Sequence, residues 1–360
     1  MAQQKRKPDI FQSSNGWSLN FGARPGATIA LGLLLFFLSG CSAAANSADP
    51  NSADTPNPIA EFQAKEDRLF QIGYRLATAN AEFCDDPVQS AGFLIHDASA
   101  YSQPDAVRTL LGLSGDIGVQ SVAIDSSADL VGLRRNHTIT HIDGQSVDSV
   151  SSAGKSDWRR AAKLRIDITQ SLADGSLSLG WKELDGSAHF ATIKGIPRCS
   201  SEFELISGDN GAAADGDRVL VGEQFAGFGY AEDELAAALS HEMAHNLLGH
   251  IPYLSEYGSG NGRGRDTERD ADRLMPWLLA NAGYDPWAAS RMMRRWGPRH
   301  GGGFLRKRSH DGWDERADMI ENEIGVVSTA AVRSDDGKVT ANWRDDFIPL
   351  LATDASTASD

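Results

Sequence analysis

The sequence has 360 residues, of which 41% are hydrophobic and 23% charged, and this composition excludes both a fully disordered chain and a protein with many membrane spans. A chain of this length exceeds one usual compact domain, so two folded units with additional ends are expected. The net charge of -15 argues against nucleic acid as a partner and against attraction to an anionic membrane surface.

The first forty residues have the pattern of an export signal. Basic residues precede an apolar run over 27–38 that is short for a membrane span. The run ends in Leu38-Ser39-Gly40-Cys41, which resembles the bacterial lipobox. That resemblance implies that residues 1–40 are a lipoprotein signal peptide and that Cys41 is lipidated; a plain signal peptide or an uncleaved anchor is the alternative. Residues 41–58, rich in Ser, Ala, Asn and Pro, are expected to be a flexible tether.

Besides Cys41, the sequence has two cysteines, Cys84 and Cys199. In an oxidising compartment an even number of cysteines predicts a disulfide, here closing a loop of about 115 residues. Two unpaired buried cysteines are the alternative.

Residues 59–85 are expected to begin the main domain. Apolar residues recur there at helical spacing up to about Cys84, which predicts one long amphipathic helix. These residues are Ile59, Phe62, Leu69, Phe70, Ile72 and Leu76.

Residues 86–198 have a different texture, with short β-prone runs separated by turns that contain Gly and Asp. This pattern predicts a small, mostly-β module. The predicted strands are 119–124, 138–142, 164–168, 177–181 and 189–193. Because Cys84 and Cys199 stand at the two ends of this module, their disulfide would clamp the neck of an insertion.

The stretch 128–147 resembles the PDZ domain pattern, in which a short helix precedes a Gly-Leu, a turn, a strand and an Asx-Gly turn. The resemblance implies binding of a C-terminal or extended peptide at a sheet edge; a rigid spacer is the alternative. Both 92–94 and 111–113 are candidates for the loop that would hold a terminal carboxylate. His137 and His141 lie in this module and are interpreted as surface strand residues.

Residues 232–250 contain the most informative motif. Acidic residues open a run of strong helix formers, so the motif is expected on a helix. His241 and His245 are four residues apart and therefore share a helix face, which lets both imidazoles reach one metal ion. Glu242 can meet a water beside that ion. This is the His-Glu-x-x-His arrangement of zinc peptidases. His250 does not fit the metzincin third-ligand spacing and is interpreted as a helix-end or outer-shell residue.

A second helix is predicted after a glycine-rich connection, with Asp266 or Thr267 as its cap and its end near Gly283. Glu268 and Asp272 are again four apart. Glu268 would complete a two-His, one-Glu zinc site, and Asp272 could accept the outer N–H of a ligand imidazole. A solvated acidic face is the alternative for this pair.

The chain then resembles the gluzincin metallopeptidases of the HtpX and CAAX-prenyl-protease type, in their periplasmic, soluble branch. The resemblance covers about 59–85 and 200–325. It includes the motif helix, Glu268, Ala271-Asp272, residues 282–286, and a late His310 followed six residues later by Arg316. This family usually has Pro after that late His, and Asp311 stands there instead.

The resemblance implies one zinc ion per chain held by His241, His245 and Glu268, with Glu242 as the general base. It further implies His310 as a donor to the developing oxyanion, Asp272 and Arg316 as supporting residues, and residues 217–221 as an edge strand for an extended substrate. The predicted metallopeptidase domain covers 199–325.

The predicted fold class is therefore α+β, with a mainly helical zincin-type metallopeptidase domain, a small edge sheet and an inserted mostly-β PDZ-like domain. The tail, 326–360, is expected to hold a small hairpin around Asp335-Asp336-Gly337 and a disordered end.

The predicted function is a zinc endopeptidase of the bacterial cell envelope, lipid-anchored and facing the periplasm. By resemblance to sorting rules, Ser42 after the lipidated cysteine favours the outer membrane. The resemblance implies misfolded or unassembled envelope proteins as substrates. The alternative is a non-proteolytic assembly factor or peptide-binding scaffold with a structural zinc.

Overall fold

The computed structural model describes residues 57–260, 262–300, 311–333, 335, 337 and 339–351. The predicted signal peptide, Cys41, most of the tether, His310 and the end at 352–360 lie outside the described residues. Within them the chain is a mixed α and β protein, compatible with the predicted α+β class. None of the helices in these segments combines the length and apolar character needed to cross a bilayer.

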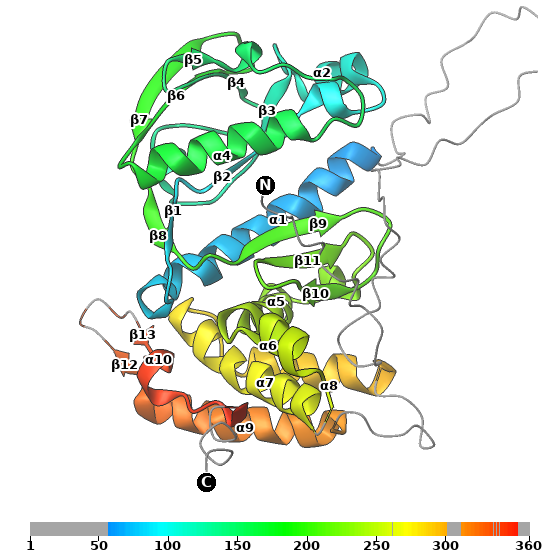
Figure 1. Ribbon diagram of the computed structural model, residues 1–360, viewed down its shortest axis with the longest axis vertical. Helices are drawn as coiled ribbons and strands as arrows, with labels where there is room; N and C mark the ends of the chain where they lie inside the picture. Colours follow the sequence, from blue (N-terminus) through cyan, green and yellow to red (C-terminus); the bar gives the residue numbers. More distant parts are fainter. Residues whose placement is uncertain are drawn as a thin grey trace, which may run out of the picture.

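Two parts of the chain pack around separate hydrophobic cores. We call residues 86–198 the β module and the remaining described residues the helical body. Figure 1 shows the β module above the helical body, with α1 running along the boundary between them. The helices of the body are α1 (Pro58–Ala79), α5 (Glu232–Leu247), α6 (His250–Tyr257), α7 (Arg263–Asn281), α8 (Ala288–His300), α9 (Trp313–Ala330) and α10 (Trp343–Asp346), with 3-10 turns η1 (Ala81–Phe83) and η4 (Ala226–Gly229).

Helix α1 starts where the sequence predicted and ends earlier. The Asn57 side chain accepts a hydrogen bond from the Ile59 N–H at 3.0 Å, and Pro58 occupies the first turn, where its missing N–H costs nothing. Asn80 ends the helix because its side chain turns back to Leu76 O and across to Leu278 O. The last predicted turn is instead the 3-10 turn η1.

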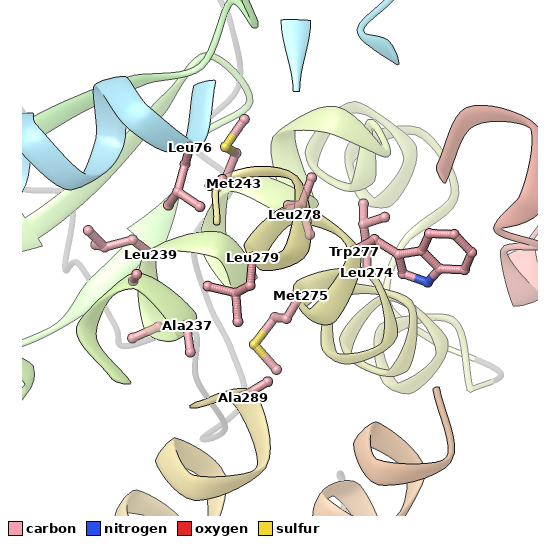
Figure 2. Packing of buried hydrophobic residues seen from close by; sticks show 14 of the residues in the cluster. Leu76, Ala237, Leu239, Met243, Leu274, Met275, Trp277, Leu278, Leu279 and Ala289 are labelled. Atoms are coloured by element: carbon pink, nitrogen blue, oxygen red, sulfur yellow. The ribbon is translucent and has the colours of Figure 1, made fainter. Parts of the chain in front are cut away.

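Helix α5 lies at the centre of the body. Residues 235–245 are all buried, so the helix carries no solvent-exposed stripe there. Its small residues, such as Ala237, allow close packing against α7, while Leu239 and Met243 fill the space toward α1. Figure 2 shows these side chains meeting Leu76 and Leu279. A helix buried on all sides is a rigid support for the polar side chains that it carries.

The β module contains a six-stranded sheet with three helices. The strand order is β2 (Phe93–Asp97), β3 (Ile117–Val122), β4 (Thr138–Ile142), β6 (Leu177–Lys182), β7 (Ala188–Ile193), with β5 (Gln145–Ser146) paired to β4. The helices are α2 (Pro104–Leu111), α3 (Ser127–Leu130) and α4 (Arg159–Ala173), with 3-10 turns η2 (Ala98–Ala100) and η3 (Val147–Ser149).

Two predictions for this module are wrong. Residues 164–168 were predicted as a strand from their alternating pattern, but they lie in helix α4. Leu164, Ile168 and Leu172 share its buried face, while Ile166 is 66% exposed, so the helical spacing of the longer stretch prevails. His137 is buried rather than on the surface. Its Nδ1 accepts a hydrogen bond from the Arg134 N–H at 3.2 Å, which satisfies this nitrogen in the interior.

A narrow neck joins the module to the body. Strand β1 (Val88–Ser90) pairs antiparallel with β8 (Ile196–Arg198), and just beyond this pair Cys84 and Cys199 form a disulfide. The cross-link closes a loop with a sequence separation of 115 residues. In the chain-entropy model a loop of this size stabilises the folded state by about 4–5 kcal/mol.

A three-stranded sheet lies beside α5, in the order β10 (Ala212–Ala214), β11 (Arg218–Gly222), β9 (Glu202–Ile206). The predicted edge strand at 217–221 is wrong, because β11 is the central strand. It pairs antiparallel with β10 and parallel with β9. The two edge strands are β10 and β9, and β10 is the one that packs against α5.

The last described segment fastens onto the body. Strands β12 (Val332–Arg333) and β13 (Val339–Thr340) form the predicted hairpin. Beyond it, the Ala341 N–H donates to the Asn281 side chain, and the N–H groups of Leu350 and Leu351 donate to the buried carboxylate of Asp270. Residues 341–351 thereby hold helix α7 in place, in addition to its neighbouring helices.

The β module contains a buried histidine, His96, whose protonation should contribute to the loss of stability in acid. Neither ring nitrogen has a hydrogen-bond partner among the described residues, and burial, with Arg165 nearby, lowers its pKa to about 4. A histidine with a lowered folded pKa binds more protons when unfolded, so stability is lost as the pH falls from about 6.5 to about 4. We expect a loss of about 3 kcal/mol over this range.

His96→Phe should remove most of that pH dependence, measured as urea unfolding free energy at several pH values. The matched control is His189→Phe, at a half-buried position of the same module. Equal pH slopes for wild type and His96→Phe would contradict the prediction.

Candidate metal centre

Helix α5 places three polar side chains in the interior of the body. His241, Glu242 and His245 are 0%, 3% and 7% exposed. The helix begins with three acidic residues, 232–234, whose charge complements the positive end of the helix dipole. One helical turn separates the two histidines, so their rings project from the same face of α5.

Helix α7 brings the carboxylates to this face. It begins at Arg263, one turn earlier than predicted, because Gly262 precedes it with a positive φ of 87° and its carbonyl accepts the Asp266 N–H. Thr267 is therefore inside the helix, and its hydroxyl donates to Gly264 O. The end of α7 at Asn281, followed by Gly283 at a positive φ of 68°, agrees with the prediction.

The predicted ligands meet at one point. His241 Nε2 lies 3.2 Å from His245 Nε2, and Glu268 oxygens lie 3.6 Å from His241 Nε2 and 3.7 Å from His245 Nε2. Each of the three residues offers a ligand atom within 4.8 Å of the others, and all three are buried. This group could hold a metal ion, and Glu268 is not part of a solvated acidic face.

Asp272 and Arg316 support the ligands from behind. Asp272 Oδ1 lies 3.1 Å from His241 Nδ1, on the side of the ring away from the cluster. The Arg316 guanidinium forms a two-pronged contact with Asp272 at 2.5 and 2.7 Å and lies 3.5 Å from Glu268. Arg316 therefore contacts both Glu268 and Asp272 of α7, which agrees with the supporting role expected for it.

The charges in this cluster are strongly coupled. Burial would raise the pKa of Asp272, but Arg316 and His241 lower it below its usual range. Burial would likewise raise the pKa of Glu268, and its hydrogen bond to His241 and the charges of the histidines and Arg316 lower it. Burial lowers the pKa of His245 to about 4, whereas Asp272 and Glu268 outweigh burial at His241 and raise its pKa to about 9.

His250 begins α6 and contacts the cluster from outside. Its Nδ1 lies 2.9 Å from His245 Nδ1, and the residue is 1% exposed. Because one of two facing nitrogens must donate and the other accept, this contact can fix the His245 tautomer. The outer-shell interpretation of His250 agrees with this geometry.

Glu242 lies beside the cluster with a different environment. Burial is the main cause that raises its pKa, to about 7, while a hydrogen bond from the backbone N–H of Ala214 on β10 acts in the opposite direction. Its Oε1 has no hydrogen-bond partner among the described residues. A buried carboxylate with one oxygen unused and a raised pKa has the properties of a general base.

The sequence did not reveal the Ala214 contact. Ala214 and Glu242 are 28 positions apart, and an alanine backbone N–H carries no chemical signal in a sequence. The only available hint was the predicted presence of a strand near the motif helix.

The residue after His310 is fixed near the site. Asp311, where the sequence departs from the family pattern, forms an ion pair with Arg269 of α7 at 2.5 and 3.1 Å. Arg269 follows Glu268 directly, so Asp311 is anchored one residue from a candidate ligand.

Comparison with models of protein families, with curated proteins and with solved structures found no match for this chain.

Proposed function

We propose that the protein is a zinc-dependent endopeptidase of the bacterial cell envelope, a gluzincin with an inserted PDZ-like domain. The observation that carries the proposal is the buried convergence of His241, His245 and Glu268 beside Glu242. Two of the ligands and the general base thus come from α5, and the third ligand comes from α7, an arrangement suited to peptide hydrolysis with a catalytic metal.

The ligand geometry fits zinc. Four-coordinate zinc lies about 2.0–2.1 Å from nitrogen or oxygen ligands, which places tetrahedral neighbours roughly 3.3–3.5 Å apart. The two ring nitrogens here are 3.2 Å apart, and each lies close to that spacing from one carboxylate oxygen, His241 Nε2 at 3.6 Å from Glu268 Oε2 and His245 Nε2 at 3.7 Å from Glu268 Oε1. Two histidines and one glutamate also form a known catalytic ligand set that leaves a coordination position open.

The charge balance supports a divalent cation. Glu242, Glu268 and Asp272 are buried carboxylates, and Arg316 is the guanidinium buried among them. Three carboxylates against one guanidinium leave two excess negative charges when all are ionised. A divalent cation neutralises them, which a buried cluster needs because isolated charges are costly in the interior.

The residues then have separate roles. Bound zinc supplies Lewis acidity at the scissile carbonyl and lowers the pKa of a water molecule. Glu242 takes the proton of the attacking water and passes it to the leaving amine. Asp272 orients His241, His250 orients His245, and Arg316 holds Asp272 and Glu268 in place. By resemblance, His310 donates to the developing oxyanion.

The substrate would bind as an extended chain along β10. This strand is at the edge of its sheet, and its Ala214 contacts Glu242. A chain added to a sheet edge is held by main-chain hydrogen bonds and therefore must be unfolded locally. Misfolded or unassembled envelope proteins satisfy that requirement. The Cys84–Cys199 disulfide supports an oxidising compartment, as expected for a lipid-anchored, periplasm-facing protein at the outer membrane.

Zinc content and cleavage of an unfolded protein test this proposal together. We expect about one zinc per chain and hydrolysis of reduced, carboxymethylated casein that stops on chelation and returns when zinc is restored. Hydrolysis that persists without metal would contradict the proposal.

A second candidate, a non-proteolytic peptide-binding scaffold with a structural zinc, is favoured by one observation. Strand β2 ends the large sheet and borders a groove suited to an extended peptide. One zinc per chain with no hydrolysis of casein would favour the scaffold.

A further inference from the structure

Helix α5 carries a second hydrogen-bond acceptor toward the small sheet, besides Glu242. Asn246 lies four residues after Glu242 on α5 and therefore projects from the same face of the helix. Its Oδ1 accepts a hydrogen bond from the Gly216 N–H at 2.8 Å. Gly216 lies in the turn between β10 and β11, and Glu242 accepts the N–H of Ala214 at the end of β10. Two acceptors of one helix thus bind two N–H groups that are two residues apart.

The spacing of the two acceptors matches the spacing of the two N–H groups. Four residues of an α-helix advance about 6 Å, and two residues of extended chain advance about 6.6 Å. Helix α5 and β10 pack against each other, and Figure 1 shows them side by side. A slip of β10 by one residue would break both hydrogen bonds, because it would place neither N–H group opposite its acceptor. The two contacts together therefore define the position of β10 along α5.

The N–H of Ala214 is at the free edge of the small sheet. The Asp215 N–H donates to Arg218 O, and the Gly222 N–H donates to Gly211 O, so Gly211 and Asp215 are bonded to β11. Bonded and unbonded residues alternate along an antiparallel pair, so the N–H and C=O of Ala214 point away from β11. This is the edge along which the proposed substrate would bind. A shift of β10 along α5 would therefore move both the partner of Glu242 and the substrate strand.

The other end of the Asn246 amide contacts the neck. Its Nδ2 donates to Ser201 Oγ at 2.8 Å, and Ser201 follows Cys199 of the disulfide by two positions. Ser201 is buried, and β9 begins at the next residue. The one side chain of Asn246 therefore joins α5, the turn after β10 and the start of β9. An amide does not ionise near neutral pH, so Asn246 keeps these contacts while Glu242 exchanges a proton.

We propose that Asn246 is a positioning residue that fixes β10 where the Ala214 N–H meets Glu242. Asn246 is not among the residues that offer metal-ligand atoms, so it acts through β10 rather than on the ion. This inference rests on the proposed peptidase function and adds to it a residue that places the substrate strand relative to the general base. Loss of the amide leaves the ligands in place and frees the strand to move, and a displacement of about 1 Å can lower a rate by about 100-fold.

Amide hydrogen exchange tests the positioning role without reference to activity. It is measured residue by residue by NMR on the zinc-loaded full chain, for wild type and Asn246→Ala. The variant should remain folded, because the position is half-buried and alanine favours a helix. We expect the amides of Gly216 and Ala214 to exchange at least about 10-fold faster in the variant, as for a weakened hydrogen bond. Ala214 decides the matter, because its N–H does not contact Asn246; unchanged exchange at Ala214 would overturn the proposal.

The kcat and KM for reduced, carboxymethylated casein test the consequence for the reaction. Asn246→Ala should lower kcat by about 10–100-fold while zinc content stays at the wild-type level. Asn246→Asp should restore most of the lost rate, because its carboxylate can accept both the Gly216 N–H and the Ser201 O–H. The matched control is Asn210→Ala, the same substitution at an exposed position before β10, and it should behave like wild type.

Three kinetic results would contradict the positioning role of Asn246. These are a wild-type kcat in Asn246→Ala, a rate that falls only in proportion to zinc content, and a rate that Asn246→Asp does not restore. Failure of the wild-type chain to hydrolyse casein would instead refute the peptidase function. The exchange rate at Ala214 would in that case still decide whether Asn246 holds β10 in place.

Discussion

Glu242→Gln is expected to lower the rate of casein hydrolysis by about 10²–10⁴-fold, the contribution typical of a general base. Glutamine has the same shape, and its amide oxygen can still accept the Ala214 N–H. It cannot take a proton from water, because an amide is not basic near neutral pH. Zinc content should stay at the wild-type level, since Glu242 is not among the three residues that offer ligand atoms.

The matched control is Glu232→Gln, the same substitution on the same helix at its exposed first turn. Its activity should stay close to that of wild type. The measurement is hydrolysis of casein at matched zinc content for all three proteins. Equal turnover by wild type and Glu242→Gln would refute the proposed mechanism.

The sequence could predict the candidate site because its main parts are local. His241, Glu242 and His245 lie within one and a half turns of a helix, and Glu268 and Asp272 lie within a little over one turn of another. Helical spacing alone therefore predicts which of these side chains face the same way. Helical spacing does not tell whether the two helices pack against each other. The small, buried residues of α5 allow that packing, and the structure shows both helices in one core.

Features that depend on distant parts of the chain could not be predicted in this way. The order β10-β11-β9 is set by tertiary pairing, so the strand with the stronger β pattern, 217–221, is central and the short 212–214 strand is at the edge. Residues 164–168 alternate like a strand over five residues, and the helical spacing of Leu164, Ile168 and Leu172 becomes visible only over a longer stretch. Local patterns cannot decide such cases, because tertiary packing overrides them.

The groove between the β module and the helical body, lined by residues of α1, β9, β2 and α4, is a further case. Tyr74 is one more residue of an amphipathic helix when the sequence is read alone, and its ring occupies a position typical of a core residue. The groove arises only because the neck at β1 and β8 brings the β module back onto α1. The same neck holds the helical body together across the insertion, since Cys84 and Cys199 join its two segments. The placement of the β module on α1 and the joining of the two segments of the helical body thus depend on one junction.

Glu268→Gln is expected to weaken zinc binding by more than about 100-fold, beyond the 10–100-fold typical of an outer-shell change. An amide is a poorer zinc ligand than a carboxylate, and the change also removes the negative charge that lies 3.6 and 3.7 Å from the two histidines. Asp272→Asn should lower zinc affinity by a smaller factor, because it alters the partner of His241 and removes no ligand atom. Zinc affinity is measured by competition with a chromogenic chelator, and circular dichroism checks that each variant is folded. Equal zinc affinity in wild type and Glu268→Gln would exclude Glu268 as a ligand, and with it a site built from two helices.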